Sequence, residues 1–308
     1  MKKHIIISIF IIFGFIVSSS VYGAFTEDDA GTVTADFLKL DIGGRAAGLG
    51  NSYAGLSDDS TAIYWNPAGL NQLSLKKLDL MHAIWFEDIF YDWVSYSMPF
   101  KYGNIGIGFQ YLSYGKIYKT DETGLEDGSF TPYEYCIITS YAKKMFNIPM
   151  GINLKYISSN IEDETAYSFA TDIGGMYKLF NDKLSLGLAV QNIGTKMKYM
   201  EEEEELPFNI KYGACYEIRS NWIAVFDINM PVDNKINIGM GSEYSYKIND
   251  LLSLAGRIGY NNRAIKTGGT NGITGGFGIK YRKYDIDYAF MPFGDLGNTH
   301  RISFGYKF

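Results

Sequence analysis

The chain reads Lys280-Tyr281-Arg282-Lys283-Tyr284-Asp285-Ile286-Asp287-Tyr288-Ala289-Phe290 near its end. From Tyr284 onward, every second residue is large and apolar or aromatic, and the residues between them are charged or small. Strict alternation of this kind is typical of a β-strand whose two faces meet different environments. The Arg282-Lys283 pair separates this strand from another alternating segment, so the stretch predicts a β-hairpin with a tight turn.

Similar alternating segments recur from Lys76 to the last residue, and there are fourteen of them. Their apolar positions span residues 78–84, 94–100, 105–111, 133–141, 150–156, 167–177, 184–190, 208–216, 222–228, 236–240, 252–260, 273–281, 284–290 and 302–308. The opposite face is small, polar or charged, and its charged residues include Lys155, Asp172, Lys211, Asp227, Glu243, Arg257 and Arg301. Alternation alone fits both a soluble β-sandwich and a membrane β-barrel, because each separates an apolar face from a polar one.

Three features favour the membrane barrel. The segments are about ten residues long, as a tilted crossing of the hydrocarbon layer requires, and aromatic residues gather at their ends. Tight turns also alternate with mostly longer connections: the turns lie at 101–104, 144–147, 180–183, 220–221, 247–250 and 282–283, and the longer connections at 116–131, 158–165, 193–206, 261–271 and 292–298. We therefore predict an all-β, 14-stranded antiparallel transmembrane β-barrel over residues 76–308, located in the outer membrane.

The two ends of the chain support this location. Lys2 and Lys3 precede an apolar run and small residues up to Gly23, so residues 1–23 are expected to be a signal peptide; an N-terminal anchor is the alternative. At the other end, Phe304, Tyr306 and Phe308 form an aromatic edge that favours closure of the barrel. We interpret these three residues as an assembly signal, with outer-membrane lipid and the barrel-assembly machinery as partners.

Residues 24–75 do not alternate, and we predict that they form a hatch inside the barrel, which is too wide for wall side chains to fill. Short helices are expected over 32–40 and 58–64, with Ser57 or Asp58 as the N-cap of the second. Pro67 and Gly69, in Asn66-Pro67-Ala68-Gly69, end that helix. The glycines at 43, 44, 48 and 50 lack the Lys-Ser/Thr of a phosphate loop and indicate coil packed in a confined space.

Composition excludes several functions. The 308-residue chain carries a net charge of −6, which argues against nucleic acid as a partner. Two cysteines and three histidines leave little for a zinc site or a thiol catalyst, so we predict a protein that is not an enzyme and has no cofactor. Helix capping explains Asp58-Asp59 better than a catalytic pair does. Cys136 and Cys215 are interpreted as small fillers, and their pairing is left open.

Five consecutive glutamates form an acidic run in the second half of the chain. Glu201, Glu202, Glu203, Glu204 and Glu205 lie in a connection that we expect to be external. Such a run is usually solvated, and divalent-cation binding is the weaker alternative. We therefore predict no metal site.

Family motifs lie mainly in the hatch: Ala35-Asp36-Phe37-Leu38-Lys39-Leu40, Gly43-Gly44-Arg45-Ala46-Ala47-Gly48-Leu49-Gly50, Asp58-Asp59-Ser60 and Tyr64-Trp65-Asn66-Pro67-Ala68-Gly69-Leu70. Together they closely resemble the opening of the PorV/PorQ family, in the FadL-like group of outer-membrane barrels. Weaker similarity continues through Val190-Gln191-Asn192-Ile193-Gly194 and Gly294-Asp295-Leu296-Gly297-Asn298. The resemblance implies a 14-stranded barrel with an N-terminal hatch that contains the Asn-Pro-Ala element.

Two functions are compatible with these observations. In the first, which the sequence slightly favours, the barrel passively conducts a hydrophobic small molecule around a movable hatch. Arg45 or Arg257 would then meet a ligand head group, although both could simply balance Asp172, Asp227 and Glu243. In the second, the resemblance to PorV implies a component of type IX protein secretion that hands exported protein onward through its external loops. A plugged lumen would favour the second function.

Overall fold

A computed structural model describes residues 31–85, 89–263, 272–292 and 298–308. The expected signal peptide, residues 1–23, lies outside the described residues. Fourteen strands form one closed barrel in the order β1-β18-β17-β16-β15-β14-β13-β12-β9-β8-β7-β6-β3-β2, and every neighbouring pair is antiparallel. The predicted fold class and strand number are confirmed.

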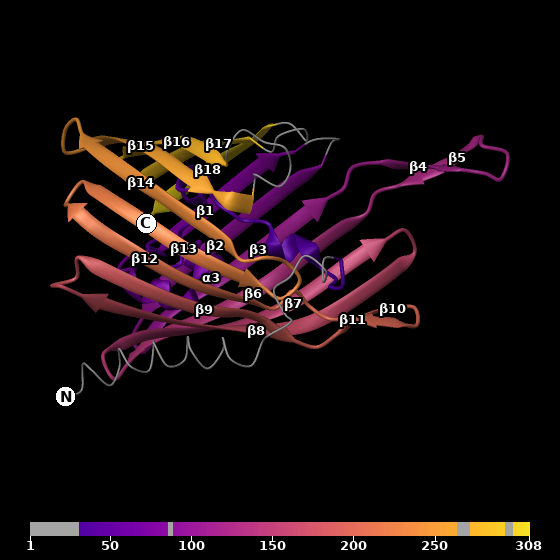
Figure 1. Cartoon of the computed structure of the whole chain (residues 1–308), viewed down its shortest axis with the longest axis horizontal. Coiled ribbons are helices and arrows are strands. Elements are labelled where there is room, and N and C mark those ends of the chain that lie inside the picture. Colours follow the sequence, from indigo (N-terminus) through magenta and orange to yellow (C-terminus); the bar gives the residue numbers. More distant parts are fainter. Residues whose placement is uncertain (1–30, 86–88, 264–271, 293–297) are drawn as a thin grey trace.

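The barrel strands coincide with the fourteen alternating segments. They are β1 (Lys77–Ile84), β2 (Phe90–Phe100), β3 (Gly103–Ser113), β6 (Tyr133–Met145), β7 (Ile148–Ile161), β8 (Glu164–Leu179), β9 (Leu184–Gly194), β12 (Asn209–Arg219), β13 (Trp222–Pro231), β14 (Asn237–Lys247), β15 (Leu252–Asn261), β16 (Ile273–Tyr281), β17 (Tyr284–Pro292) and β18 (Asn298–Lys307). Figure 1 shows these strands tilted along the long axis of the molecule.

The two faces of the barrel wall differ sharply in polarity. Outward positions are apolar and open, as at Leu154, Ile258 and Ile302, each more than half exposed. Inward positions hold buried polar and charged side chains such as Asp172 and Arg301. This arrangement is the reverse of a soluble protein and matches a wall that faces lipid outside and a polar interior.

Connections divide the barrel into two rims. We call the end with the tight turns, such as Phe146–Asn147 between β6 and β7, the turn rim; both turn residues have positive φ, at 51° and 66°. Paired positive φ values at two central residues are typical of the type I′ turn. The opposite end is the loop rim. One expected loop there, 158–165, is wrong, because β7 and β8 continue to Ile161 and from Glu164.

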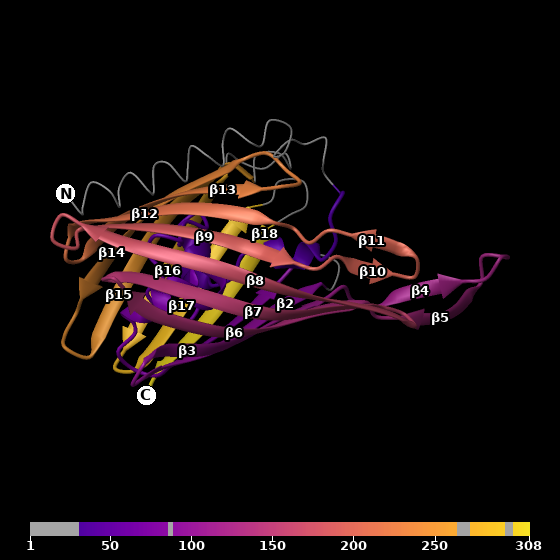
Figure 2. The same cartoon turned by 90° about the horizontal axis from the view of Figure 1, so that it is seen from below.

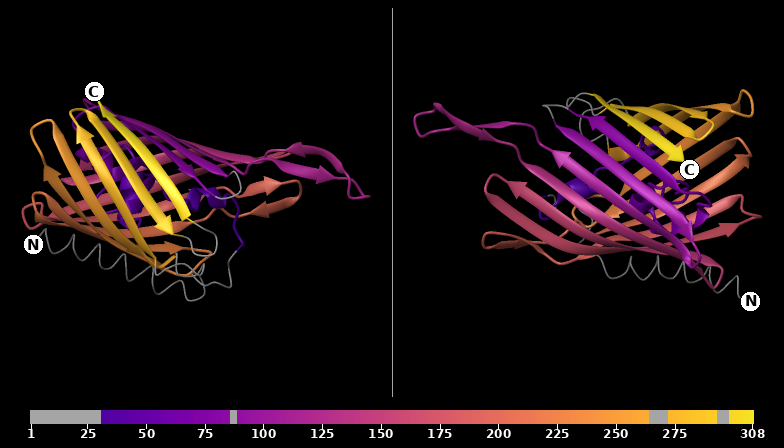
Figure 3. Two further views of the ribbon diagram at one scale, coloured as in Figure 1. Left: turned by 90° about the horizontal axis from the view of Figure 1, so that it is seen from above. Right: turned by 180° about the vertical axis from the view of Figure 1, so that it is seen from behind.

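Two small hairpins project from the loop rim. One consists of β4 (Ile117–Thr120) and β5 (Glu126–Phe130), and the other of β10 (Met197–Tyr199) and β11 (Glu202–Glu204). Figures 1, 2 and 3 agree that β4–β5 extends well beyond the barrel, with β10–β11 on the same side. The hairpins occupy connections that the sequence predicts only as loops. We call residues 114–132 the arm.

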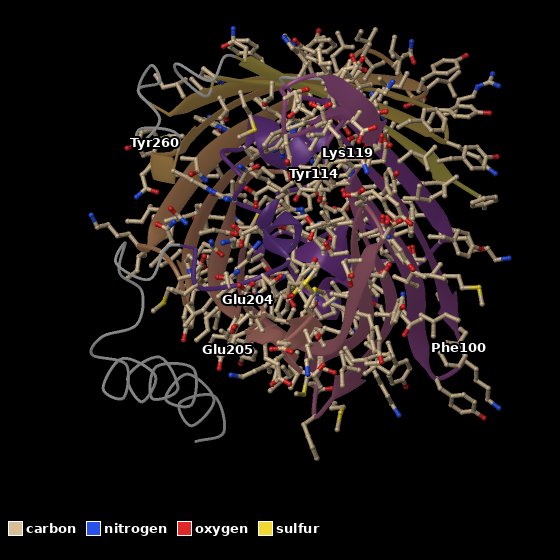
Figure 4. All side chains as sticks on the ribbon, turned by 90° about the vertical axis from the view of Figure 1, so that its right-hand side faces the viewer. Phe100, Tyr114, Lys119, Glu204, Glu205 and Tyr260 are labelled. Atoms are coloured by element: carbon tan, nitrogen blue, oxygen red, sulfur yellow. The ribbon has the colours of Figure 1, made fainter. Side chains whose placement is uncertain are left out.

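Residues 36–72, which precede β1, lie inside the barrel, as Figure 4 shows from the loop rim. They contain η2 (Asp36–Lys39), α2 (Gly44–Gly48), α3 (Ala62–Trp65) and η3 (Pro67–Gln72). The expected helices over 32–40 and 58–64 are thus shorter than predicted, and the supposed coil at 44–48 is helical. No helix in the described part of the chain is long and apolar enough to cross a membrane.

The last residue closes the seam of the barrel. The backbone N–H of Phe308 donates to the carbonyl of Lys76 at 3.0 Å, next to the pairing of β18 with β1. Its ring contacts the ring of Tyr96 on β2, with centroids 5.9 Å apart. Phe308 therefore bridges the first and last strands at the turn rim, where the aromatic side chains face outward.

We expect deletion of Phe308 to impair assembly, because the final strand loses both a seam hydrogen bond and an aromatic contact across it. The measurement is heat-modifiable migration of the barrel extracted from membranes. Phe146→Ala is the matched control, since that ring is 93% exposed in a turn. Normal migration of the Phe308 deletion would contradict the assembly role.

Candidate functional site

Helix α2 packs its glycine side directly against the barrel wall. The Gly44 N–H donates to Ser303 Oγ at 2.7 Å, and a Cβ at Gly44 would lie 2.9 Å from the Asp287 carbonyl oxygen. At Gly48 a Cβ would lie 3.2 Å from Gly276. Gly50, with φ of 67°, continues this contact next to β15. The glycines therefore allow the backbone of this segment to pack directly against β15–β18. The segment is helical, not coil as the sequence had indicated.

The barrel wall also has glycines where it contacts the hatch. At seven wall positions, an added Cβ would lie within 2.5 Å of a hatch atom: Gly151, Gly174, Gly187, Gly213, Gly239, Gly241 and Gly259. Real Cβ atoms do not approach other atoms so closely, so hatch and wall are in direct backbone contact across β7–β15. Sequence reasoning missed these residues as a site; the available signal was glycine on the inward parity of successive strands.

Asn66 fixes the turn of the Asn-Pro-Ala-Gly element. Its side-chain oxygen accepts the N–H of Ala68 at 3.1 Å, and its Nδ2 donates to the Ala54 and Gly175 carbonyls. Pro67 then begins η3, where its missing N–H needs no partner. Gly69 sits so close to Ser57 that a Cβ would lie 2.3 Å from its carbonyl. The element ends α3 and also holds the hatch against the wall.

Arg45 centres a buried ion cluster near the turn rim. It makes two hydrogen bonds to Glu243, from Nε at 2.8 Å and Nη2 at 2.9 Å, and one from Nη1 to Asp58 at 2.6 Å. Arg257 donates to the same Glu243 at 2.6 Å and pairs with Asp287 at 2.7 Å. Glu243 is therefore shared by one arginine of the hatch and one of the wall, an arrangement that joins the two.

Asp58 and Asp59 accept hydrogen bonds from different partners. Asp58 does not cap a helix, because its carboxylate accepts from Arg45 and from Tyr53, whose hydroxyl lies 3.0 Å away. Asp59 accepts the Thr61 N–H at 2.9 Å just before α3. The capping interpretation is thus wrong for Asp58, whose partner comes from thirteen residues earlier in the chain.

Two further wall carboxylates bind the hatch and its surroundings. Asp172 pairs with Lys155 at 2.8 Å and accepts from Asn153, which also donates to the hatch carbonyl of Ile63. Asp227 accepts the backbone N–H groups of Tyr53 and Ala54 at 2.9 and 2.8 Å. Neither carboxylate contacts Arg45 or Arg257, so the expected balance by arginine applies to Glu243 alone.

The other two charged candidates lie toward the loop rim. Arg301 donates to the hatch carbonyl of Asp41 at 2.7 Å. Lys211 places its ammonium over the rings of Tyr64 and Trp65, 4.7 and 4.3 Å from their centroids. All seven lumen candidates are buried. The hatch is thus held by charged and polar wall groups on nearly every side.

The remaining candidates do not join this site. Glu202–Glu204 form β11 and are exposed, and Glu205 bonds through its carbonyl to the Thr34 N–H. Among the described residues, no group of three or more His, Cys, Asp or Glu side chains is arranged to hold a metal. Cys136 and Cys215 are both buried free thiols.

The family model described as type IX secretion system protein PorV matches residues 24–241, which is more than half of the chain. None of the curated proteins matches the chain significantly in sequence.

Among solved structures, the toluene transporter TodX of Pseudomonas putida is similar at 12% identity, covering 87% of this chain and 98% of TodX, with a TM-score of 0.59. The toluene transporter TbuX of Ralstonia pickettii covers the same shares at 11% identity and a TM-score of 0.59. A FadL homologue of Pseudomonas aeruginosa gives 10% identity, the same shares and a TM-score of 0.56. At such low identity these likenesses show the fold alone.

Proposed function

Because the chain belongs to the PorV family of type IX secretion system proteins, we propose that it contacts exported protein at the cell surface through its loop rim. The observation that carries this proposal is the contrast between the two parts of the molecule. The lumen is filled by a hatch in backbone contact with the wall, while the arm projects beyond the rim. Such a molecule offers a protein-binding surface rather than an open passage.

The arm has the properties of a contact surface. Leu125 and Tyr118 are 68% and 59% exposed on it, although both side chains are large and apolar or aromatic. Tyrosine is enriched where proteins bind one another. The short strands β4 and β5 also leave their outer edges unpaired, because they pair only with each other in the described sheet order. Unpaired edges are able to accept an additional strand.

The base of the arm is fixed to the barrel. Tyr114 donates its hydroxyl to Glu134 Oε2 at 2.5 Å, and its N–H donates to the Pro132 carbonyl at 3.1 Å. Burial and the neighbouring Glu134 carboxylate both raise the pKa of Tyr114, so the phenol keeps its proton at neutral pH and the hydrogen bond persists. Lys119 on the arm pairs with Glu162 at the β7–β8 turn. These contacts orient the arm without covering its tip.

Passive conduction of a hydrophobic molecule is the second candidate, and the fold likeness to two toluene transporters favours it. The hydrogen bonds and ion pairs between hatch and wall argue against conduction. The Arg45–Glu243 pair and the bond from Asn153 to the Ile63 carbonyl join the hatch to the wall, so displacing the hatch to open a passage would separate them. Breaking buried pairs of this kind is costly, because it leaves uncompensated polar groups.

The proposal is tested by replacing residues 116–131 with a short Gly-Ser turn in the living cell. We expect exported type IX substrates to fall at the cell surface by more than about tenfold, whereas the level of the barrel itself stays unchanged. Phe146→Ala, in an exposed turn at the opposite rim, is the control and should leave export unchanged. Normal export with a correctly assembled, armless barrel would contradict the proposal.

A further inference from the structure

A small polar cavity of about 60 Å³ lies between hatch and wall toward the loop rim. Asp41 and Tyr64 of the hatch line it on one side, and Asn209, Lys211 and Asn229 of the wall on the other. A neighbouring hollow of about 20 Å³ shares Asp41, Lys211 and Asn229 and reaches Trp65 and Asp227. Cavities of this size and polarity are large enough to hold hydrogen-bonding atoms of a ligand or ordered water.

Lys211 is the most unusual side chain in this cavity. It is only 4% exposed, and within the described ranges no hydrogen-bond acceptor or carboxylate pairs with its ammonium. The Tyr64 and Trp65 rings attract its charge, but they leave its three N–H donors without ordinary acceptors. Burying such a group is costly unless it is hydrogen-bonded. The Lys211 ammonium is therefore available to donate hydrogen bonds to a ligand in the cavity.

Other unpaired atoms belong to residues that line the cavity or the neighbouring hollow, and they include both donors and acceptors. Asn209 Oδ1 and Asp227 Oδ1 are buried acceptors without a partner among the described residues, and Trp65 Nε1 is a buried donor without one. In contrast, Asn209 Nδ2 is fully used by Gln191 and Asn229. Buried polar groups are normally satisfied, so several unsatisfied ones around one cavity indicate a missing partner that both accepts and donates.

The charges around Lys211 balance without an added ion. Asp41 and Asp227 attract its ammonium, and Lys155 and Arg263 oppose it. Lys155 is already paired with Asp172, and Arg263 lies 3.7 Å from Asp41. One cation, Lys211, is left facing both the cavity and the neighbouring hollow, and one anion, Asp227, is left facing the hollow. An anionic ligand would disturb this balance, whereas a neutral ligand keeps it.

We infer that this cavity binds the end of a sugar, a neutral ligand whose hydroxyl groups each donate and accept hydrogen bonds. Lys211 and Trp65 would donate to sugar oxygens, and Asn209 and Asp227 would accept from sugar hydroxyls. Asn234, in the connection between β13 and β14, and Arg263, just after β15, also line the cavity, which places it toward the loop rim. This inference goes beyond the proposed secretion role and does not depend on it.

The test is a titration of the purified full-length barrel in a detergent that carries no sugar head group. The probes are glucose, galactose, mannose and N-acetylglucosamine, with acetate as the anionic probe and glycinamide as the peptide-like probe. Tryptophan fluorescence and calorimetry give the readout, because Trp65 borders the neighbouring hollow and its ring contacts the Lys211 ammonium. We expect at least one sugar to bind saturably with Kd of about 1 mM.

Two variants locate the binding. Lys211→Met and Asn229→Leu should each weaken sugar binding by at least about tenfold, and the second decides if the first does not fold. Lys280→Met is the matched control, since Lys280 lines a separate cavity near the turn rim. This variant should bind sugar as tightly as the unmodified barrel does. The inference is overturned if no sugar of the panel binds, if both cavity variants bind normally, or if acetate or glycinamide binds in place of sugar.

Discussion

A barrel carrying Gly187→Ala together with Gly213→Ala is expected to lose its sealed hatch. The two glycines are direct cross-strand partners on β9 and β12. Because they have no side chains, the backbone of Ala54 and Gly55 packs directly against them. A Cβ at Gly187 would lie 2.1 Å from the Ala54 carbonyl oxygen, and one at Gly213 would lie 2.3 Å from the Gly55 nitrogen. Both contacts are with backbone, which cannot rotate away as a side chain can.

The expected loss of unfolding free energy is about 1–3 kcal/mol for each substitution, as for other overpacked interiors. Urea unfolding followed by tryptophan fluorescence measures it, and ion conductance in planar bilayers reports the displaced hatch. Gly256→Ala is the matched control on β15, because nothing lies within 4 Å of its Cβ position. A double variant as stable and as closed as the Gly256→Ala barrel would show that hatch and wall are not in this contact.

Glu243→Ala is expected to destabilise the hatch by about 3–5 kcal/mol, since it leaves two buried arginines without their shared carboxylate. The Glu243 side chain is 6% exposed, and those of Arg45 and Arg257 are 12% and 0% exposed. Water therefore cannot easily replace the lost partner. The measurement is the urea midpoint, together with protease cleavage within residues 36–72 of the folded barrel.

Two comparisons isolate the ion cluster. Glu217→Ala removes an exposed glutamate from β12, two strands away from Glu243, and should change stability by no more than about 0.5 kcal/mol. Arg45→Met combined with Glu243→Ala should cost less than the sum of the two single changes, because the double variant leaves one fewer unpaired charge. Strict additivity of the two effects would contradict a direct interaction between them.

The barrel could be predicted from sequence because its signal is repeated. Each strand such as Tyr284–Pro292 alternates an apolar outer face with a polar inner face, and fourteen repeats leave little freedom in the count. The arm was less visible, because β4 has only four residues and lies among turn-forming glycines. Residues 158–165 were predicted as a loop because they are mostly polar, but most of them lie in β7 and β8, which are longer than the other strands.

The site was only partly predictable, because its contacts are made across long sequence distances. Nothing local shows that Asp58 turns toward Arg45, or that Arg45 meets Glu243 almost two hundred residues later. Helix α2 has five residues and two glycines, so periodicity cannot reveal it, and packing against β16 and β17 stabilises it instead. The parity of Glu243 and Arg257 placed them inside the barrel, but which hatch residue each meets required the structure.

Native mass spectrometry of the barrel, gently extracted from its own membrane, tests the central claim most directly. If the loop rim contacts exported or secretion-system protein while the hatch keeps the lumen closed, a protein partner should be found in stoichiometric amount. That partner should disappear when residues 116–131 are replaced by a short turn. A barrel that instead carries a small hydrophobic molecule, with no protein partner and no change on loss of the arm, would contradict the claim and favour the conduit.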